Sequence, residues 1–533
     1  MRTTVKIFVL LIFLQLKLSE EQQIAIVEHQ VSIDGKLTPE ETLNRNADKY
    51  IELIESLTKD REIFVIVFPE ATLDNVKRKE DLKSYSVEIS NYENPCTVHS
   101  KKYPKFFQKL SCAAIKHHTA LVLNLIEEFY KQFYTSDVVL LEDGSIMFSI
   151  RRELRLGENF LYHYPIAFAI PVDYYLNYIL APNLFTMKMV KFTPTSLITG
   201  FGFSYEKIIT LAEKRYYFVC SNWISELPFL TSLQVHQMWA QEFNLTLLFS
   251  GANNPKTGQG GTGIFDFSSN TVAMDIVTRG GTKAYVYDLN DGLLTPMENK
   301  SVDTLSEEMD SFHFQVDLDL YRYESMVLNT SETNSTNVEV CYNKTKNNYF
   351  CCQFSVRVSV KESTQNKKQY TYHLVAYKGY KTYYLVFEPG GVEICGVIAC
   401  LDSNVRSCGK RFDKYQEVEW PITFEEIVIK ANFSWPLKER IYSSSQFPNS
   451  LLSSMRPLSP NFTTWSKQVV CDDTSNVSYL ERTFALTKRH NRILTFAIFG
   501  RNFTLIDARS TVRRLIFISP LLIFVNIGVA LFI

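Results

Sequence analysis

The pattern of apolar and polar positions alternates between helical and strand periods through the first half of the chain. A helix is predicted to begin after Thr38, which can cap it, with Pro39 at its first position and Glu41 completing a capping box. Apolar residues then recur at helical spacing as far as Leu57. The next segment, EIFVIVFPEA, is an apolar run rich in β-branched residues, and it is predicted to be a buried strand with Glu70 at its carboxyl end.

The same alternation continues beyond this strand. Apolar residues recur at helical spacing in LSCAAIKHH and TSLQVHQMWAQEF, which are predicted to be helices. The composition is that of strands in TALVLNLIEE, YYFVCSNW and LTLLFSGAN. The segment DVVLLEDGSIMFSIRREL is predicted to be two strands that turn at Asp143 and Gly144, and SLITGFGFS to be a strand that runs into a helix. Because strands and helices alternate this regularly, the first half is predicted to be an α/β domain.

The pattern changes near residue 300. The stretch from about 300 to 350 is polar and contains several glycosylation sequons. Beyond it the chain is predicted to form short strands, such as YFCCQFSVRVSV, QYTYHLVAYKGY and KTYYLVFEP, with six cysteines between residues 341 and 408. We therefore expect a second, smaller β-rich domain that contains disulfides.

The two ends of the chain indicate a secreted protein held at a membrane. Residues 2–18, RTTVKIFVLLIFLQLKL, place two basic residues before a short apolar run, as in a secretory signal peptide, and we assign residues 1–19 to that signal. Residues 515–533 carry no charge and no polar tail follows them, which favours a GPI-anchor signal over a permanent transmembrane helix. The expected location is the extracellular face of the plasma membrane, and a transmembrane helix stays the alternative.

Composition narrows the class of protein further. The 533 residues carry a formal net charge of −1, so the overall charge gives no reason to expect nucleic acid binding. No cysteine pair has the spacing and histidine neighbours of a zinc site, and we expect neither a metal nor another cofactor. Sequons fit a surface glycoprotein, and they lie at Asn244, Asn299, Asn329, Asn334, Asn343, Asn432, Asn461, Asn476 and Asn502.

Because the secretory pathway is oxidising, most of the cysteines are expected to form disulfides. Cys96 and Cys112 would close a short loop in the α/β domain, and the later cluster is expected to pair largely within the second domain. Cys220 is interpreted instead as a buried core thiol. The disulfide candidates are Cys96, Cys112, Cys341, Cys351, Cys352, Cys395, Cys400, Cys408 and Cys471.

Several collinear stretches resemble the biotinidase and vanin branch of the nitrilase, or carbon–nitrogen hydrolase, superfamily. They include IAIVEHQV, VFPEATL, LSCAAIKHHTALVLNL and WISELPFLTSLQVHQMWAQEFNLTLLFSGANNP with GGTGIF in the first half. FCCQFSV and YYLVFEPGGVEICGVIAC resemble the cysteine-bearing β domain of that branch. The resemblance implies an αββα sandwich over residues 20–300, a vanin-type β-rich domain over 301–505, and an anchor signal or membrane tail over 506–533.

The resemblance also implies where the catalytic residues of the family fall. The family uses a Glu as general base, a Lys that stabilises the oxyanion and a Cys nucleophile. The base matches Glu70 in FPEA. Counting from Gly144 puts Arg152 at the lysine position, and counting from Gly200 in GFGFSYE puts Ser204 at the cysteine position. One of the three positions therefore keeps its residue type.

These departures weaken the expected amidase chemistry. A thiol has a reference pKa near 8.5 and attacks as a thiolate, whereas a serine hydroxyl needs a strong, aligned base. An arginine stays protonated and cannot readily donate a proton as a lysine can. We therefore predict a catalytically impaired protein that binds a small-molecule amide or another ligand. The alternative is an active ectoenzyme that uses Ser204 to cleave linear amides, as the family does with pantetheine or biotinyl amides.

Other candidate residues carry weaker signals. Glu158 in LGENF is a candidate second carboxylate of the pocket, and Tyr205 and Trp223 are candidate pocket residues, with Trp223 also readable as a core aromatic. His117 and His118 are adjacent on a predicted helix and point apart, so they are expected at its surface or end rather than on a metal. The sequence leaves the ligand and the oligomeric state open.

Overall fold

The structure is a computed structural model. It describes most of the chain between residues 23 and 502, and the longest internal segment outside the description is 162–215. The described ranges are 23–30, 35–74, 76, 79–98, 102–153, 156–157, 160–161, 216–244, 246–266, 271–288, 292–293, 300–343, 349–362, 367–381, 390–434, 444–472 and 477–502.

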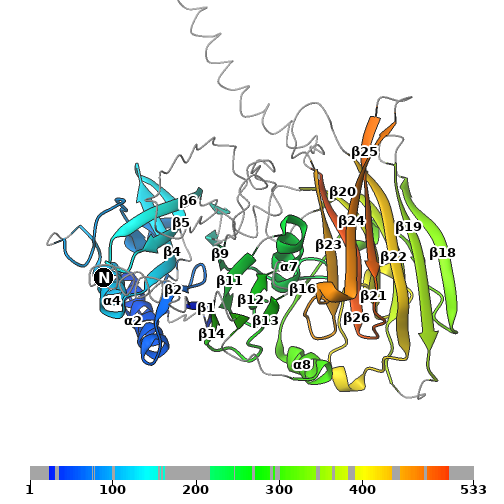
Figure 1. Ribbon diagram of the computed structural model, residues 1–533, viewed down its shortest axis with the longest axis horizontal. Helices are drawn as coiled ribbons and strands as arrows, with labels where there is room; N and C mark the ends of the chain where they lie inside the picture. The colour runs from blue at the N-terminus through cyan, green and yellow to red at the C-terminus, as the bar shows by residue number, and fades with distance from the viewer. Residues whose placement is uncertain are drawn as a thin grey trace, which may run out of the picture.

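The strands of the N-terminal part form one hydrogen-bonded, twelve-stranded sheet that divides into two sheet layers lying face to face (Figure 1). One has the strand order β14-β1-β2-β4-β5-β6, and β1, β2 and β4 run parallel in it. The other has the order β13-β12-β11-β9, and it meets the first where His29 of β1 pairs with Ala252 of β11. The strands are β1 Gln23–Gln30, β2 Ile63–Val67, β4 Ala120–Phe129, β5 Gln132–Leu140, β6 Ile146–Glu153, β9 Tyr216–Ser221, β11 Thr246–Asn253, β12 Thr262–Asp266, β13 Thr271–Asp275 and β14 Lys283–Asp288.

Helices cover the outer faces of the two sheets and complete an α–β–β–α arrangement. Helices α2 (Pro39–Thr58) and α4 (Lys105–His117) pack on the first sheet through one apolar cluster, and a second cluster fills the space between the sheets. Helix α7 (Ser232–Phe243) packs on the other side. The capping box of Thr38 and Glu41 is present, so the predicted start of α2 is confirmed.

Short elements connect the longer helices and strands in both parts of the chain. They are η1 Lys79–Asp81, α3 Leu82–Tyr85, β3 Ser86–Val87, β7 Leu156–Gly157, β8 Phe160–Leu161, β10 Glu226–Leu227, β15 Gly292–Leu293, α8 Val302–Glu308, η2 Met309–Ser311, β16 Gln315–Val316, η3 Leu320–Arg322, η4 Val405–Ser407, η5 Tyr415–Glu417 and η6 Pro460–Phe462.

The C-terminal part is a sandwich of two five-stranded sheets, with orders β17-β20-β21-β26-β23 and β18-β19-β22-β25-β24. Their strands pair antiparallel. The expectation of short strands is wrong, because continuous alternation such as that of YFCCQFSVRVSV forms one long strand with every second residue facing the core. The strands are β17 Glu324–Val327, β18 Asn334–Asn343, β19 Tyr349–Val360, β20 Thr371–Lys381, β21 Gly390–Cys400, β22 Ile422–Ser434, β23 Ser444–Leu452, β24 Thr463–Asp472, β25 Val477–Leu486 and β26 Ile493–Asn502.

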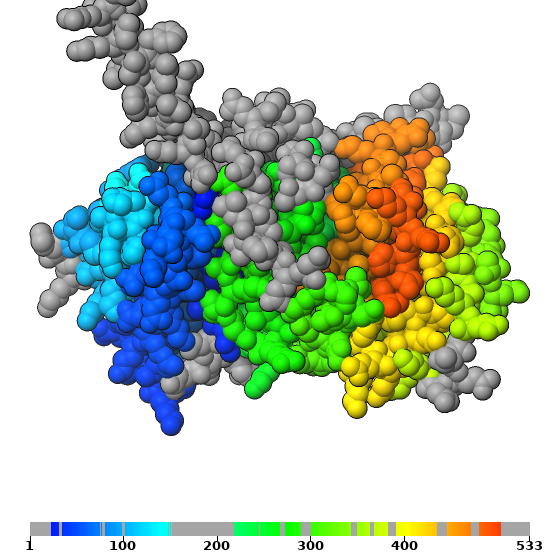
Figure 2. Space-filling view, turned by 60° about the horizontal axis from the view of Figure 1, so that its bottom comes forward, coloured from blue at the N-terminus to red at the C-terminus, as the bar shows by residue number. Residues whose placement is uncertain are grey.

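The two parts are joined by an extensive polar and apolar contact. Helix α7 lies against β23, where the side chain of Gln234 donates to Asn449 at 2.7 Å. In Figure 2 the green middle of the chain, which includes α7 and α8, lies between the blue and cyan N-terminal residues and the yellow and orange C-terminal strands. One apolar cluster runs continuously from α7 into the C-terminal strands. The fold is thus a nitrilase-like α/β region packed against a β-rich domain.

Four disulfides lie within the described residues. Cys96 joins Cys112 as expected, on the segment before α4 and on α4 itself. The other three lie in the C-terminal domain and pair Cys341 with Cys351, Cys352 with Cys395, and Cys400 with Cys408. Multiple disulfides place the protein in the secretory pathway.

The segments predicted to target and anchor the chain, residues 1–19 and 506–533, lie outside the described residues. Among the helices that the structure describes, none is long and apolar enough to cross a membrane.

Candidate functional site

The site is built around Glu70, which follows the carboxyl end of β2. Its backbone leaves the sheet at this point: Phe68 still donates to Val122 of β4 at 3.0 Å, and Ala71 adopts a left-handed conformation with φ of 55°. Such a conformation is uncommon for a residue with a side chain and is often found at functional sites. Glu70 itself is fully buried, with 0% of its surface exposed. A carboxylate is therefore held at a sharp bend inside the protein.

Side chains of the neighbouring strands hold this bend in place. The backbone N–H of Ala71 donates to the side-chain oxygen of Asn124 on β4 at 3.3 Å. The Nδ2 atom of Asn124 in turn donates to Asp137 at 2.7 Å and to Thr135 at 3.0 Å, both on β5. These bonds connect the bend to two strands of the sheet, and they fix the position of the backbone next to Glu70.

Helix α2 supports the same bend from the outer layer. The ring of Tyr50 stacks on Phe68 with centroids 3.8 Å apart, and its hydroxyl hydrogen-bonds to Thr72. Thr72 also donates to the carbonyl of Pro69 at 3.1 Å. Because residues on both sides of Glu70 are held by α2, the rigidity of the site depends on the packing of this helix.

Strand β6 contains two adjacent arginines, Arg151 and Arg152, and the structure describes the side chain of Arg151 only. Arg152 lies in β6 opposite Thr135 of β5, and its side chain is outside the description. Arg151 donates from Nε to Glu127 at 2.8 Å, and its guanidinium lies 3.7 Å from the ring centroid of Phe129. Glu127 is fully buried and also accepts from Ser136. Sequence reasoning missed this ion pair, because its residues are distant along the chain and meet only through the strand register.

The other candidate residues have separate outcomes. Ser204, Tyr205 and Glu158 lie outside the described residues. Trp223 is 7% exposed within an apolar cluster and donates from its indole nitrogen to the carbonyl of Leu230 at 2.7 Å, so it belongs to the core. Cys220 on β9 is 2% exposed in the cluster between the sheets and takes part in none of the four disulfides, which confirms its interpretation as a core thiol.

The glycosylation sequons divide by exposure. Asn502 is 2% exposed and its side chain donates to Glu393 at 3.1 Å, so its burial disfavours glycosylation at this position. Asn299 and Asn476 lie outside the described residues, and Asn343 belongs to β18 with its side chain undescribed. Asn334 is half-buried, whereas the exposed acceptors are Asn244, Asn329, Asn432 and Asn461.

Sequence reasoning also missed a second buried carboxylate, Glu28 of β1. Its Oε1 atom accepts from the side chain of Asn253 at 2.6 Å and from the backbone of Gly261 and Val277 at 3.1 and 3.0 Å. Burial raises the pKa of Glu28 to about 7, against the lowering effect of these hydrogen bonds. The only sequence signal is a charged residue inside the apolar run IAIVEHQ. Through these bonds Glu28 ties β1 to the end of β11, to the loop before β12 and to the loop after β13.

Metal binding finds no support in the described residues. Two groups of side chains place potential ligand atoms within 4.8 Å of one another, His373 with Cys400 and Cys408, and Glu339 with Cys341 and Cys351. In each group the two cysteines are joined to one another in a disulfide, so no thiolate is available as a ligand.

Known proteins that are similar to this chain agree with its two-part architecture. The vanin C-terminal domain family matches residues 312–506. Vanin-like protein 1 of Drosophila melanogaster is 25% identical, over 85% of this chain and 81% of its own length. A pantetheinase of Sus scrofa is 24% identical, over 90% of this chain and 88% of its own.

Among solved structures, Nit3 of Saccharomyces cerevisiae, a member of the nitrilase superfamily, matches with a TM-score of 0.33 and 14% identity. The match covers 51% of this chain and 90% of that protein. The sequence relatives extend over both parts of the chain, and the C-terminal family lies where the β-sandwich is found. Over most of its length the chain is a distant homologue of the vanin, pantetheinase and biotinidase branch of the nitrilase superfamily.

Proposed function

We propose that this protein is a vanin-like surface glycoprotein that has lost most or all of the amidase activity of its family. The observation that carries the proposal is the set of residues at the three catalytic positions. Glu70 keeps the base, whereas Arg152 stands at the position of the lysine and Ser204 at the position of the cysteine. The buried, hydrogen-bonded bend after β2 supports the part of the proposal that keeps the framework of the site.

The loss of the thiol removes the nucleophile that the reaction needs. A serine hydroxyl is much less acidic than a thiol, and it attacks at neutral pH only with a well-aligned base, usually a histidine. A glutamate has a reference pKa near 4.3 and is a weak base for an alcohol. Loss of the nucleophile from a catalytic set of this kind lowers turnover by on the order of a million-fold.

The arginine adds to this loss. Its guanidinium keeps its proton, since its pKa exceeds about 12, so it can donate hydrogen bonds to an oxyanion but cannot pass a proton to the leaving amine. An arginine can also form a two-bond pair with a carboxylate, which would lower the basicity of Glu70. Both changes act in the same direction, and ligand binding is the function that we propose the pocket retains.

The experiment measures hydrolysis of pantetheine and of biocytin by the purified ectodomain. We expect no turnover above that of a Ser204→Ala variant of the same preparation. Hydrolysis that is present in the wild type and absent from Ser204→Ala would show an active serine amidase and would end the proposal. A Cys220→Ser variant is the control for loss of a thiol elsewhere in the chain. Cys220 is buried in the core, and in the sequence it is adjacent to neither Arg152 nor Ser204.

We also propose that the protein is held at the outer face of the plasma membrane by a GPI anchor. The uncharged run 515–533 at the end of the sequence and the secretory features of the chain support it. Treatment of intact cells with a phospholipase specific for GPI is expected to release the protein into the medium. Retention on the cells after this treatment would favour a transmembrane helix.

A further inference from the structure

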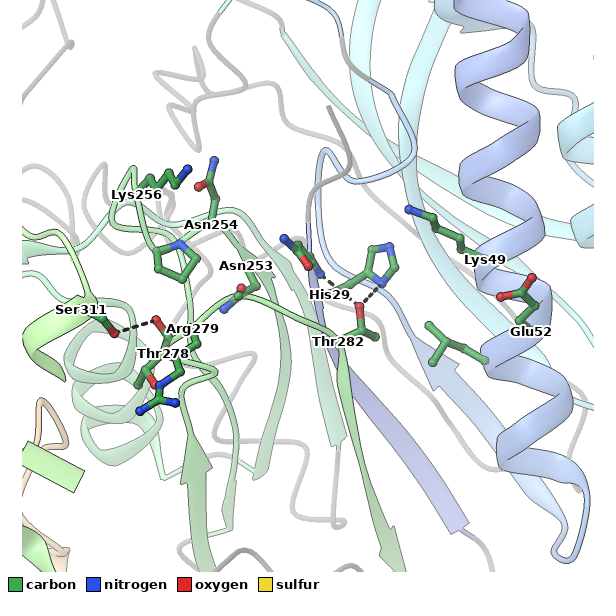
Figure 3. Close-up of a pocket in the computed structure, with 14 residues that line it drawn as sticks. His29, Lys49, Glu52, Asn253, Asn254, Lys256, Thr278, Arg279, Thr282 and Ser311 are labelled. Carbon is green, nitrogen blue, oxygen red and sulfur yellow. Dashed lines mark hydrogen bonds between the residues drawn. The ribbon is translucent and has the colours of Figure 1, made fainter. Parts of the chain in front are cut away.

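A pocket of about 980 Å³ opens at the edge where the two N-terminal sheets meet (Figure 3). Helix α2 forms one wall, and the loops after β11 and β13 form the other. His29 and Gln30, the last residues of β1, lie between them. Glu70 is absent from the lining of this pocket.

The charge of this lining is mainly positive. Lys49, Lys256 and Arg279 contribute three cationic groups, and Glu52 contributes one carboxylate. Within the described part of the chain, no hydrogen bond or ion pair engages any of the three cations, whereas many other surface lysines and arginines of this protein do have an acidic partner. The pocket thus gathers positive charge that its own residues leave uncompensated.

The floor of the pocket carries a buried imidazole nitrogen without a hydrogen-bond partner. The backbone N–H of Gln30 donates to the Thr282 hydroxyl at 3.3 Å, and this hydroxyl lies 3.0 Å from Nδ1 of His29. The hydroxyl can therefore donate to Nδ1, which leaves the proton of a neutral imidazole on Nε2. His29 is 3% exposed, and its Nε2 atom has no hydrogen-bond partner. A buried donor of this kind is costly unless something accepts from it.

Lys49 and His29 face the same part of the pocket. Figure 3 shows the Lys49 side chain reaching from α2 toward the His29 ring, with Thr282 on the opposite side of that ring. Burial first, and then the nearby charge of Lys49, lower the pKa of His29 to about 4, so the imidazole is neutral at physiological pH. An ammonium group and an unpartnered imidazole nitrogen therefore face the same part of the pocket, and in the tautomer with its proton on Nε2 both can donate to one ligand acceptor.

The second wall offers the complementary kind of group. Asn253 is fully buried; its Nδ2 donates to Glu28 and to the carbonyl of Val277, and its Oδ1 has no hydrogen-bond partner. Gly280 keeps space open here, because a side-chain carbon at that position would lie 3.3 Å from the Gln30 amide nitrogen and 4.0 Å from Asn253 Oδ1. A ligand with a hydroxyl or amide N–H, or a water that it holds, would satisfy this acceptor.

We propose that this pocket binds a small organic anion, whose carboxylate or phosphate group lies against Lys49 and His29 and whose polar body extends toward Asn253. Arg279 and Lys256 add favourable charge at the second wall. The pocket is separate from the Glu70 site but touches the same support, because the His29 ring packs edge-on against Tyr50 at 5.2 Å between centroids. The proposal stands apart from the loss of amidase activity, since it concerns binding by other residues.

The test is a calorimetric titration of the purified ectodomain with inorganic phosphate and, separately, with succinate. We expect saturable binding of at least one of them, weakened at least tenfold by Lys49→Gln, because a charge-assisted hydrogen bond is lost. Lys59→Gln is the matched control: it removes the same charge from the exposed end of α2, outside the pocket, and should bind as the wild type does. The stronger of the two ligands tells a phosphate site from a carboxylate site.

Arg279→Gln provides a second, independent variant on an exposed loop, and it is expected to weaken binding by several-fold. Folding of each variant is checked by its circular dichroism and melting temperature. Absence of saturable binding of both anions to the wild type, or equal binding by wild type and Lys49→Gln, would overturn the proposal. Neither result depends on amide hydrolysis, so failure here leaves the proposed loss of activity to its own assay.

Discussion

The buried Lys381 provides the most specific prediction about how the two domains are held together. Lys381 ends β20 and is 1% exposed at its side chain, and its Nζ lies 2.5 Å from Glu226 of β10 and 2.6 Å from Asp317 after β16. Burial alone would lower the pKa of this lysine, but Asp317 and Glu226 together hold it above its usual value. One cation thus compensates two carboxylates that come from the N-terminal domain and from the segment joining the domains.

Replacing Lys381 by Met keeps much of the side-chain volume but leaves Asp317 and Glu226 without their cation. Removal of one partner from a buried ion pair costs about 3–5 kcal/mol, because an uncompensated charge remains in a low-dielectric site. Lys368 is a suitable control, since it pairs with Glu417 at 2.8 Å but both side chains are about half exposed. The corresponding Lys368→Met change is expected to leave the free energy of unfolding nearly unchanged, because solvent screens an exposed ion pair.

The assay is a urea titration of the ectodomain followed by tryptophan fluorescence and circular dichroism. We expect Lys381→Met to lower the free energy of unfolding by about 3–5 kcal/mol, and to separate the unfolding of the two domains into distinct transitions. Since the folded pKa of Lys381 is raised, its contribution is fully present below the unfolded pKa near 10.4 and is lost only as the pH rises through the folded value. Equal effects of Lys381→Met and Lys368→Met at pH 7 would refute the reasoning.

Three further predictions follow from buried groups and from the sequons. Glu28 binds its proton more tightly in the folded protein, where its pKa is about 7. The free energy of unfolding should therefore fall as the pH rises from about 4.5 through about 7. Urea titrations at several pH values should show that Glu28→Gln removes most of this fall. The Cys96–Cys112 disulfide spans 16 residues, and its loss in a double serine variant should lower the free energy of unfolding by about 3 kcal/mol. Asn329 is exposed and Asn502 is buried, so Asn329→Gln should remove one glycan from the measured mass whereas Asn502→Gln should remove none.

Each of these predictions has an outcome that contradicts it. A wild-type protein whose stability has the same pH dependence as Glu28→Gln would show that this carboxyl does not titrate near neutrality. A variant without the Cys96–Cys112 bond that is as stable as the wild type would show that this disulfide does not stabilise the fold by restricting the unfolded chain. A glycan found on Asn502 would contradict the burial of β26 at that residue.

Much of the N-terminal fold could be predicted because its signals are local. The capping box at Thr38 and the turn at Asp143-Gly144 are both present, and at the turn Gly144 has φ of 80° and donates to the carbonyl of Leu141 at 2.8 Å. Strand lengths in the C-terminal domain were less predictable. An alternating pattern shows which residues face the core, but it does not show where pairing with a neighbouring strand ends.

The candidate site could be predicted only in part. Glu70 stands at the end of an apolar strand, and this is a local signal. The partners of Glu28 lie more than 220 residues away along the chain. Lys49 and His29 lie more than 200 residues from the second wall of the pocket. Clusters of this kind arise from sheet register and loop packing, which a single sequence does not specify.

Conversion of both substituted positions back to the residues of the family tests the central claim most directly. The double variant Ser204→Cys with Arg152→Lys returns a thiol and an amine to the two positions that the resemblance assigns to the cysteine and the lysine of the family. The measurement is hydrolysis of pantetheine by the purified ectodomain. We expect no hydrolysis by the wild type. The double variant is expected to hydrolyse pantetheine, and an added Glu70→Gln change is expected to abolish its turnover. Hydrolysis by the unmodified protein at the rate of an active pantetheinase would contradict it.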